Sequence, residues 1–309
     1  MPEANRPCGI FSPVLTPFDS GLAPDAQRLV RHCRWLLAQD VGLAVFGTNS
    51  EANSLSVSEK RRLLDALLEA GVPPARLLPG TGACALPDAI ELTRHAVRTG
   101  CAGALMLPPF YYKGVSDEGL FRSFARVIDA VADERLRVFL YHIPAVSGVP
   151  LSLSLIERLL QAYPGIVAGI KDSSGDWSNT AAMLERFQPR GFDVFAGSEN
   201  FLLATMRAGG AGCITATGNV NPGPIVRLFE TWKGADAEAQ QELLDRQRAA
   251  FAAFPMIPAM KAAIAWKSGR TDWRHVRPPL VELDPAQQLQ LQAALDRVGF
   301  SMPEAESLA

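Results

Sequence analysis

The sequence of 309 residues has little of what marks several classes of protein. Its five cysteines and four histidines show no CxxC, HxH or HxxxH spacing, so we predict neither a disulfide framework nor a metal site. No run of about 18 uncharged apolar residues occurs, so no transmembrane helix is expected. The formal net charge of -2 gives no sign of a surface for nucleic acid or an anionic membrane. No basic start followed by an apolar run is present, which predicts a cytoplasmic protein.

What the sequence does contain is an alternation of short apolar runs with amphipathic stretches. Eight runs are apolar nearly throughout, which is typical of strands buried on both faces of a parallel sheet. The stretches between them have helical periodicity, and Ser56 with Glu59 forms a predicted capping box. Eight strand-helix units predict an α/β fold, a (β/α)8 TIM barrel, and the absence of GxGxxG after the first run disfavours a doubly wound open sheet. The runs are 9–15, 42–46, 76–79, 102–107, 137–141, 166–170, 193–196 and 211–215.

The character of the sequence changes after Gly223. Residues 224–254 form a long helical pattern rich in Ala, Gln, Glu and Arg, and further helical patterns continue to residue 298. A minimal barrel needs fewer helices than this. We therefore predict a catalytic barrel domain of residues 1–223 and a C-terminal helical extension of residues 224–309 packed on it.

Lys171 directly follows the sixth apolar run, at the carboxyl end of a predicted barrel strand, where the active sites of TIM barrels lie. Partial burial there disfavours the charged ammonium, and a neutral amine can attack a carbonyl carbon to form a Schiff base. Tyr141 ends the preceding run, so we expect its hydroxyl beside Lys171, where it can transfer protons. The structural alternatives are a lysine that reaches solvent or pairs with Asp172, and a buried aromatic residue with a satisfied hydroxyl.

Thr48 and Asn49 lie in the turn after the second run, next to Gly47. Backbone N–H groups and hydroxyls in such a turn can bind a carboxylate. An ordinary ST-turn or helix N-cap is the alternative for these two residues.

Together these segments resemble the dihydrodipicolinate synthase / N-acetylneuraminate lyase family of class I lyases, which form a Schiff base. The resemblance extends from about Pro13 to Phe300, nearly the whole chain. The matching motifs are the pyruvate-binding loop at 47–51 (GTNSE), the strand 4 signature at 109–113 (PFYYK), the YxxP motif at 141–144 (YHIP) and the Schiff-base lysine motif at 169–172 (GIKD).

The resemblance implies a role for each matching residue. Lys171 would form the imine with the ketone of pyruvate or another 2-oxo acid, and Tyr141 would relay protons. Thr48 would bind the carboxylate together with its neighbour Asn49, and it would connect Tyr141 to a second tyrosine. That tyrosine is Tyr111, which in the family reaches in from a neighbouring subunit of a homotetramer built as a dimer of dimers. The covalent lysine imine implies no metal or other cofactor.

Other positions bear on the substrate. Gly197 and Ile214 match residues that line the pyruvate pocket of the family. The segment after the seventh run could hydrogen-bond a polyhydroxylated tail, as in the sialic acid lyase branch. Segments 171–176 and 257–261 instead resemble the 4-hydroxy-2-oxoglutarate aldolase branch. The residues of the possible tail site are Ser198, Glu199 and Asn200.

The chain departs from the family pattern at two places. Asn49 and Ser50 replace the second Thr and the Gly of the loop. Val146 stands where true dihydrodipicolinate synthases have an arginine for the carboxylate of aspartate semialdehyde, and valine cannot make that charge-assisted pair. We therefore predict an aldolase or lyase that acts on a 2-oxo acid, with pyruvate as one partner and an aldehyde co-substrate. The alternatives are a dehydratase of a sugar-derived 2-keto-3-deoxy acid, and a synthase in which another cation replaces the arginine.

Overall fold

The computed structural model describes residues 6–309, and these form two compact units. The central unit consists of residues 6–8 and Pro73–Ile214. The terminal unit consists of Gly9–Val72 and Thr215–Ala309.

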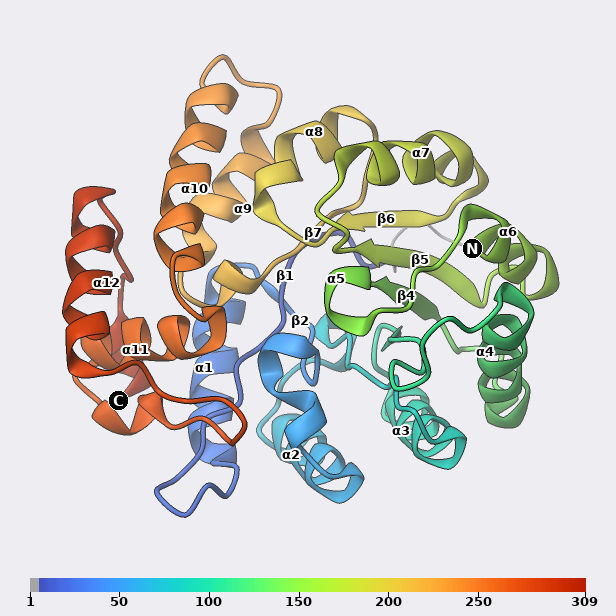
Figure 1. Ribbon diagram of the computed structural model, residues 1–309, viewed down its shortest axis with the longest axis horizontal. Coiled ribbons are helices and arrows are strands. Elements are labelled where there is room, and N and C mark those ends of the chain that lie inside the picture. The colour runs from blue at the N-terminus through green and yellow to red at the C-terminus, as the bar shows by residue number, and fades with distance from the viewer. Residues whose placement is uncertain (1–5) are drawn as a thin grey trace. The chain divides into compact units, whose positions relative to one another are not determined.

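The central unit is built on five neighbouring parallel strands, in the order β7-β6-β5-β4-β3 (Figure 1). Their residues are almost all buried, as expected for apolar strands covered by helices. In the register of β4 and β5, Tyr141 lies opposite Lys171 and His142 lies opposite Asp172. The strands are β3 (Ala104–Met106), β4 (Val138–His142), β5 (Val167–Asp172), β6 (Asp193–Ala196) and β7 (Gly212–Ile214).

Helices alternate with these strands along the chain, and several begin at a side-chain N-cap. Ser116, Ser152 and Asp176 each accept a hydrogen bond from a backbone N–H of the first helical turn. The apolar faces of the helices join the strands in one hydrophobic core. The helices are α3 (Leu86–Arg98), α4 (Asp117–Val131), α5 (Pro144–Ser147), α6 (Leu153–Ala162), α7 (Trp177–Phe187) and α8 (Leu202–Arg207), with 3-10 turns at Pro74–Arg76, Gln188–Arg190 and Glu199–Phe201.

The third apolar run, 76–79, was expected to be a strand, and the structure differs there. It continues from a 3-10 turn into a single parallel bridge, Gly80 to Leu105, rather than a ladder. Leu105 donates to the carbonyl of Pro79, and Thr81 donates to the carbonyl of Leu105. Pro79 has no N–H to donate, so the pairing beside β3 stays short.

In the terminal unit, the first two apolar runs form a parallel pair of strands, with Phe11 opposite Gly42. A Cβ atom at Gly42 would lie 2.4 Å from the ring of Phe11, so glycine allows this close approach. The capping box of Ser56 and Glu59 is confirmed at the start of the second helix. The elements are β1 (Gly9–Ser12), α1 (Ala26–Ala38), β2 (Gly42–Leu43), the 3-10 turns Thr48–Ser50 and Ala52–Ser54, and α2 (Val57–Glu69).

The C-terminal segment of the same unit is helical, as predicted, but the expected long helix over 224–254 is broken. It is divided into α9 and α10 at residues 232–236, where Gly234 interrupts the helical pattern. Helices α10, α11 and α12 lie next to one another (Figure 1). The division of the chain at residue 223 stays a prediction. The elements are a 3-10 turn at Ala216–Asn219, α9 (Pro222–Thr231), α10 (Ala237–Ala252), α11 (Met256–Ser268), 3-10 turns at Thr271–Arg274 and Ala305–Leu308, and α12 (Pro285–Arg297).

Between residues 6 and 309, no single helix has the length and hydropathy to cross a membrane. Only α10 and α11 taken together reach those values, and the two helices are bent by 103° relative to each other.

Candidate active site

Lys171 and Tyr141 come together at the carboxyl ends of β5 and β4. The Lys171 side chain is buried, with 2% of the residue exposed. Its Nζ donates a hydrogen bond of 3.2 Å to the hydroxyl of Tyr141, and Nζ lies 4.3 Å from the centre of the tyrosine ring. The parallel register of β4 and β5 brings the two side chains together, because residues opposite each other in adjacent strands point to the same face of a sheet. The arrangement places an amine that can act as a nucleophile beside a phenol that can carry its protons.

Two phenylalanine residues lie on the same face of the sheet as Lys171. Phe195 on β6 lies opposite Lys171 on the side away from Tyr141, and Phe139 precedes Tyr141 by two residues on the same face of β4. The two phenylalanine rings meet edge to face, with their centres 6.0 Å apart. Gly169 makes room for this layer, since a Cβ atom there would lie 2.8 Å from the ring of Phe139.

Asp172 is not the partner of Lys171. The two residues are consecutive in β5 and therefore face opposite sides of the sheet. The Asp172 carboxylate accepts hydrogen bonds from the backbone N–H and hydroxyl of Ser174, from the Asn179 amide and, at 2.6 Å, from the Thr180 hydroxyl. The structure thus excludes both alternatives for Lys171: the lysine neither reaches solvent nor pairs with Asp172.

His142 lies beside Asp172 on that same outer face. Its Nδ1 accepts a hydrogen bond from the backbone N–H of Leu151, which places the proton of a neutral ring on Nε2. Burial lowers the pKa of His142, and the charge of Asp172 opposes this shift. His142 is therefore a neutral packing residue of β4 at physiological pH.

The segment after β6 approaches β5 very closely. Gly197 donates its N–H to the carbonyl of Asp172, and a Cβ atom at position 197 would lie only 2.0 Å from the hydroxyl of Ser173. Ser198 caps the following 3-10 turn by accepting from the N–H of Asn200. Glu199 is buried whereas Asn200 is exposed, so the three residues proposed for a substrate tail have different surroundings. Ile214 ends β7 and is fully buried.

Tyr111 lies in the loop after β3, far more exposed than Lys171. It is 75% exposed and meets Tyr112 edge to face, with ring centres 5.4 Å apart. Lys113 ties this loop to α5, because its ammonium donates to the carbonyls of Phe110 and Ser147. The loop is therefore held in place at Lys113, and it exposes the rings of Tyr111 and Tyr112 on the surface of the chain.

In the terminal unit, Ser50 replaces the glycine of the family pattern, and its hydrogen bonds close the 47–51 turn. The hydroxyl of Ser50 accepts the N–H of Gly47, and the N–H of Ser50 donates back to the Gly47 carbonyl. Thr48 begins the 3-10 turn thus formed, with Asn49 as its second residue. Thr16 donates its hydroxyl to the carbonyl of Ser50 and fixes the turn from outside. Serine in place of glycine thus adds a hydrogen bond that holds the turn.

A buried ion pair that sequence reasoning missed follows this turn. Glu51 has a left-handed backbone, with φ 55°, and its carboxylate pairs with Lys261 of α11; both side chains are 0% exposed. Glu51 also accepts the N–H of Arg277, and Lys261 also donates to the carbonyl of His275. Burial lowers the pKa of Lys261 to about 8, against the opposing effect of Glu51. A lysine within the apolar helix sequence MIPAMKAAIAW was the available signal, but its partner lies 210 residues away.

Within the described part of the chain, no group of three or more His, Cys, Asp or Glu residues is placed to hold a metal ion. All five cysteines there are free thiols, and Cys33 and Cys213 are buried.

Comparison with known proteins gives one consistent result. Residues 6–298 match the dihydrodipicolinate synthetase family. An uncharacterized DapA-like lyase of Chloroflexus aurantiacus is 34% identical, over 95% of this chain and 97% of its own length. The crystal structure of dihydrodipicolinate synthase from Agrobacterium tumefaciens superimposes with a TM-score of 0.87 at 31% identity, over 94% of this chain and 99% of that chain. The crystal structure of YagE from E. coli K12, solved in complex with pyruvate, has a TM-score of 0.86 at 29% identity, covering 95% and 99% of the two chains.

These superpositions cover nearly the whole chain and confirm the predicted fold class. The chain is an α/β protein with its parallel strands curled into a TIM barrel and with helices added at the C-terminus.

Proposed function

Because this chain belongs to the dihydrodipicolinate synthetase family of pyruvate-dependent class I lyases and aldolases, we propose that it cleaves or condenses a 2-oxo acid through an imine on Lys171. One observation carries the proposal: the buried Lys171 Nζ lies 3.2 Å from the hydroxyl of Tyr141. A lysine that served only stability would gain little from a buried position beside a phenol.

In the proposed reaction, the neutral Lys171 amine adds to the ketone carbon of the 2-oxo acid. Tyr141 gives a proton to the carbinolamine oxygen, water leaves, and the protonated imine forms. In the cleavage direction the Tyr141 phenolate takes the proton of the substrate hydroxyl beyond the breaking carbon-carbon bond, the imine accepts the electron pair of that bond, and an aldehyde departs. The remaining enamine takes a proton on carbon, and water then releases pyruvate and restores Lys171.

The 47–51 turn is proposed to hold the substrate carboxylate. Thr48 and Asn49 supply a hydroxyl and backbone N–H groups, the donors that suit a carboxylate. Support for this role comes from the motif in the sequence and from the hydrogen bonds that close the turn. Gly197 and Ile214 are proposed to line the pyruvate pocket, on the motif match alone.

For the second substrate we propose a neutral or polyhydroxylated aldehyde. Val146 on α5 is 65% exposed and offers no charge for a carboxylate. Ser198, Glu199 and Asn200 are proposed for the hydroxyl groups of such a tail. One observation favours the alternative of a synthase in which another cation replaces the arginine. The ammonium of Lys113 donates a hydrogen bond to the carbonyl of Ser147, which follows Val146 in α5. A dehydratase would use the same lysine and tyrosine.

Reduction with borohydride tests the proposed chemistry. Pyruvate and a panel of other 2-oxo acids are each added with the reductant, and the modified peptide is mapped by mass. We expect the adduct on Lys171, its loss in Lys171→Arg because guanidinium cannot form the imine, and its retention in the control Lys233→Arg, an exposed lysine. An adduct on another lysine, or none with any acid, rejects the proposal.

Product analysis then separates the reaction types. An aldolase releases pyruvate and an aldehyde, whereas a dehydratase releases water and keeps the carbon chain. Faster condensation of pyruvate with aspartate semialdehyde than with neutral aldehydes would establish the synthase alternative.

A further inference from the structure

A cavity of about 350 Å³ lies in the central unit, at the opposite end of the strands from Lys171. Its wall includes Phe139, Val167 and Asp193, which lie at the amino ends of β4, β5 and β6. Lys171 is four residues further along β5 than Val167, roughly 13 Å at the rise of an extended strand. The cavity is therefore separate from the proposed catalytic residues. Its volume is within the range of small-molecule sites.

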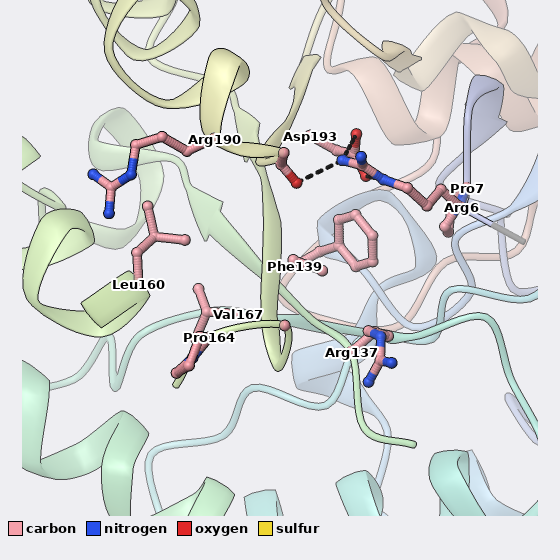
Figure 2. Close-up of a pocket in the computed structure, with 12 residues that line it drawn as sticks. Arg6, Pro7, Arg137, Phe139, Leu160, Pro164, Val167, Arg190 and Asp193 are labelled. Carbon is pink, nitrogen blue, oxygen red and sulfur yellow. Dashed lines mark hydrogen bonds and ion pairs between the residues drawn. The ribbon is translucent and has the colours of Figure 1, made fainter. Parts of the chain in front are cut away.

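The inner surface of the cavity is apolar. Phe139 and Val167 are buried at its base, and Leu160 of α6 with Pro164 forms a further part of the wall. Figure 2 shows these side chains between the charged residues of the rim. A ligand that fits must bring an apolar body to this surface.

The rim carries three guanidinium groups and one carboxylate. Arg6 forms two hydrogen bonds with Asp193, of 2.6 and 3.1 Å, drawn as dashed lines in Figure 2. Arg190 pairs with Glu157 at 2.6 Å. Arg6 thus has a carboxylate of its own, whereas Arg190 shares Glu157 with Arg186.

Arg137 is different from the other two arginines. Its Nη1 donates to the backbone carbonyls of Glu134 and Leu136, at 2.8 and 2.7 Å. Within residues 6–309 it forms no ion pair with a carboxylate. The carbonyls hold the guanidinium in place without neutralising it, so one positive charge at the cavity wall is left to attract an anion. The planar fork of arginine suits a carboxylate group.

We propose that this cavity binds a small organic carboxylate, with its apolar body against Phe139, Leu160 and Val167 and its anionic group at Arg137. We take the occupant as a monoanion, because Arg137 is the one guanidinium of the cavity lining that pairs with no carboxylate within residues 6–309. Nothing in the proposed reaction on Lys171 requires this second site, so the two proposals stand or fall separately.

Calorimetric titration with 3-phenylpropanoate tests the proposal, and its neutral analogue 3-phenylpropanamide is the matched ligand. We expect saturable binding of the acid and at least tenfold weaker binding of the amide. Arg137→Gln should weaken binding of the acid at least tenfold. The control Arg135→Gln should leave it unchanged, since Arg135 is paired with Asp133 and does not line the cavity.

A second variant guards against misfolding of the first. Leu160→Glu places a carboxylate on the wall from the partly exposed surface of α6 and should weaken binding by repulsion, while circular dichroism stays that of the wild type. Hydrogen exchange should show ligand protection at residues 137–139 and 165–168. Equal binding by wild type and Arg137→Gln, protection confined to other segments, or no saturable binding of the acid would overturn the proposal.

Discussion

At the scale of single residues, Lys171 owes its setting to its neighbours across the sheet. Tyr141 lies opposite it on β4 and Phe195 lies opposite it on β6. One neighbour offers a hydroxyl and the other excludes water. The pair of Lys171 and Tyr141 was expected from the sequence, because the last residues of consecutive parallel strands meet at one edge of a sheet.

Removal of the Tyr141 hydroxyl should affect the reaction and not the fold. Tyr141→Phe is expected to lower kcat by roughly 10²–10⁴-fold, the usual contribution of a positioned proton-transfer group. The thermal midpoint should change little, since the ring and its packing are kept. Steady-state kinetics and a melting curve measure both. A kcat equal to that of the wild type would remove Tyr141 from the mechanism.

The buried pair of Glu51 and Lys261 makes a different prediction. Lys261→Met leaves an unpaired carboxylate inside the terminal unit and should lower the free energy of unfolding by about 3–5 kcal/mol. The double variant Glu51→Gln with Lys261→Met removes both charges and should recover most of that loss. Urea unfolding measures each value. Glu157→Gln, which disrupts exposed pairs with Arg186 and Arg190, is the control and should cost about 1 kcal/mol or less. A double variant that lost as much free energy of unfolding as the two single substitutions together would contradict the coupling of the two charges.

At the scale of elements, the C-terminal segment anchors the start of α2. Arg277 donates to both carboxylate oxygens of Glu59, at 2.6 and 3.0 Å, and to the carbonyl of Ser54. Glu59 is also the acidic residue of the capping box with Ser56. The Glu59 carboxylate therefore caps the start of α2 and also pairs with Arg277, which is distant in the sequence.

This arrangement has a pH signature. Hydrogen bonding to Arg277 is the main reason that the pKa of Glu59 is lowered from 4.5 to about 2, and burial opposes the shift. Because the folded-state pKa lies below the unfolded value, the stabilisation is complete above pH 4.5 and is lost as the pH falls from 4.5 to 2. Melting curves across this window should show a smaller fall of the midpoint in Glu59→Gln than in the wild type. Glu69→Gln, at the exposed end of α2, is the control and should follow the wild type.

At the scale of the whole molecule, the exposed Tyr111 and Tyr112 point to assembly. Aromatic rings are enriched at the buried centres of interfaces, and these two project from a loop that Lys113 anchors. We propose a homotetramer, a dimer of dimers, in which Tyr111 acts in the active site of a neighbouring subunit.

Mixing two inactive variants tests this assembly. Tyr111→Phe and Lys171→Arg chains, each inactive alone, should regain partial activity as hybrids. One site of a hybrid dimer would combine a native lysine with the partner's native tyrosine. Native mass spectrometry verifies the exchange of subunits. Verified exchange without any return of activity would place Tyr111 within its own chain or outside the mechanism.

Local pattern in the sequence was enough to predict most of the elements and the meeting of Lys171 with Tyr141. Periodicity reports which residues are buried, and the carboxyl ends of parallel strands lie together whatever the loops do. The short bridge at Gly80 and the break before α10 were missed. Pro79 could have indicated the short bridge and Gly234 the break before α10, since each residue interrupts a regular pattern.

Only the tertiary structure decided which residues far apart in the chain are in contact. The pair of Glu51 and Lys261 spans 210 residues, and the cavity wall joins Arg6 to Asp193, 187 residues away. No periodicity encodes such pairings, because each depends on where whole helices and strands come to pack. The sequence by itself determined which side chains can do chemistry and the class of fold that carries them. The packing determined which charges are paired and which guanidinium, that of Arg137, lines a cavity without a carboxylate partner among residues 6–309.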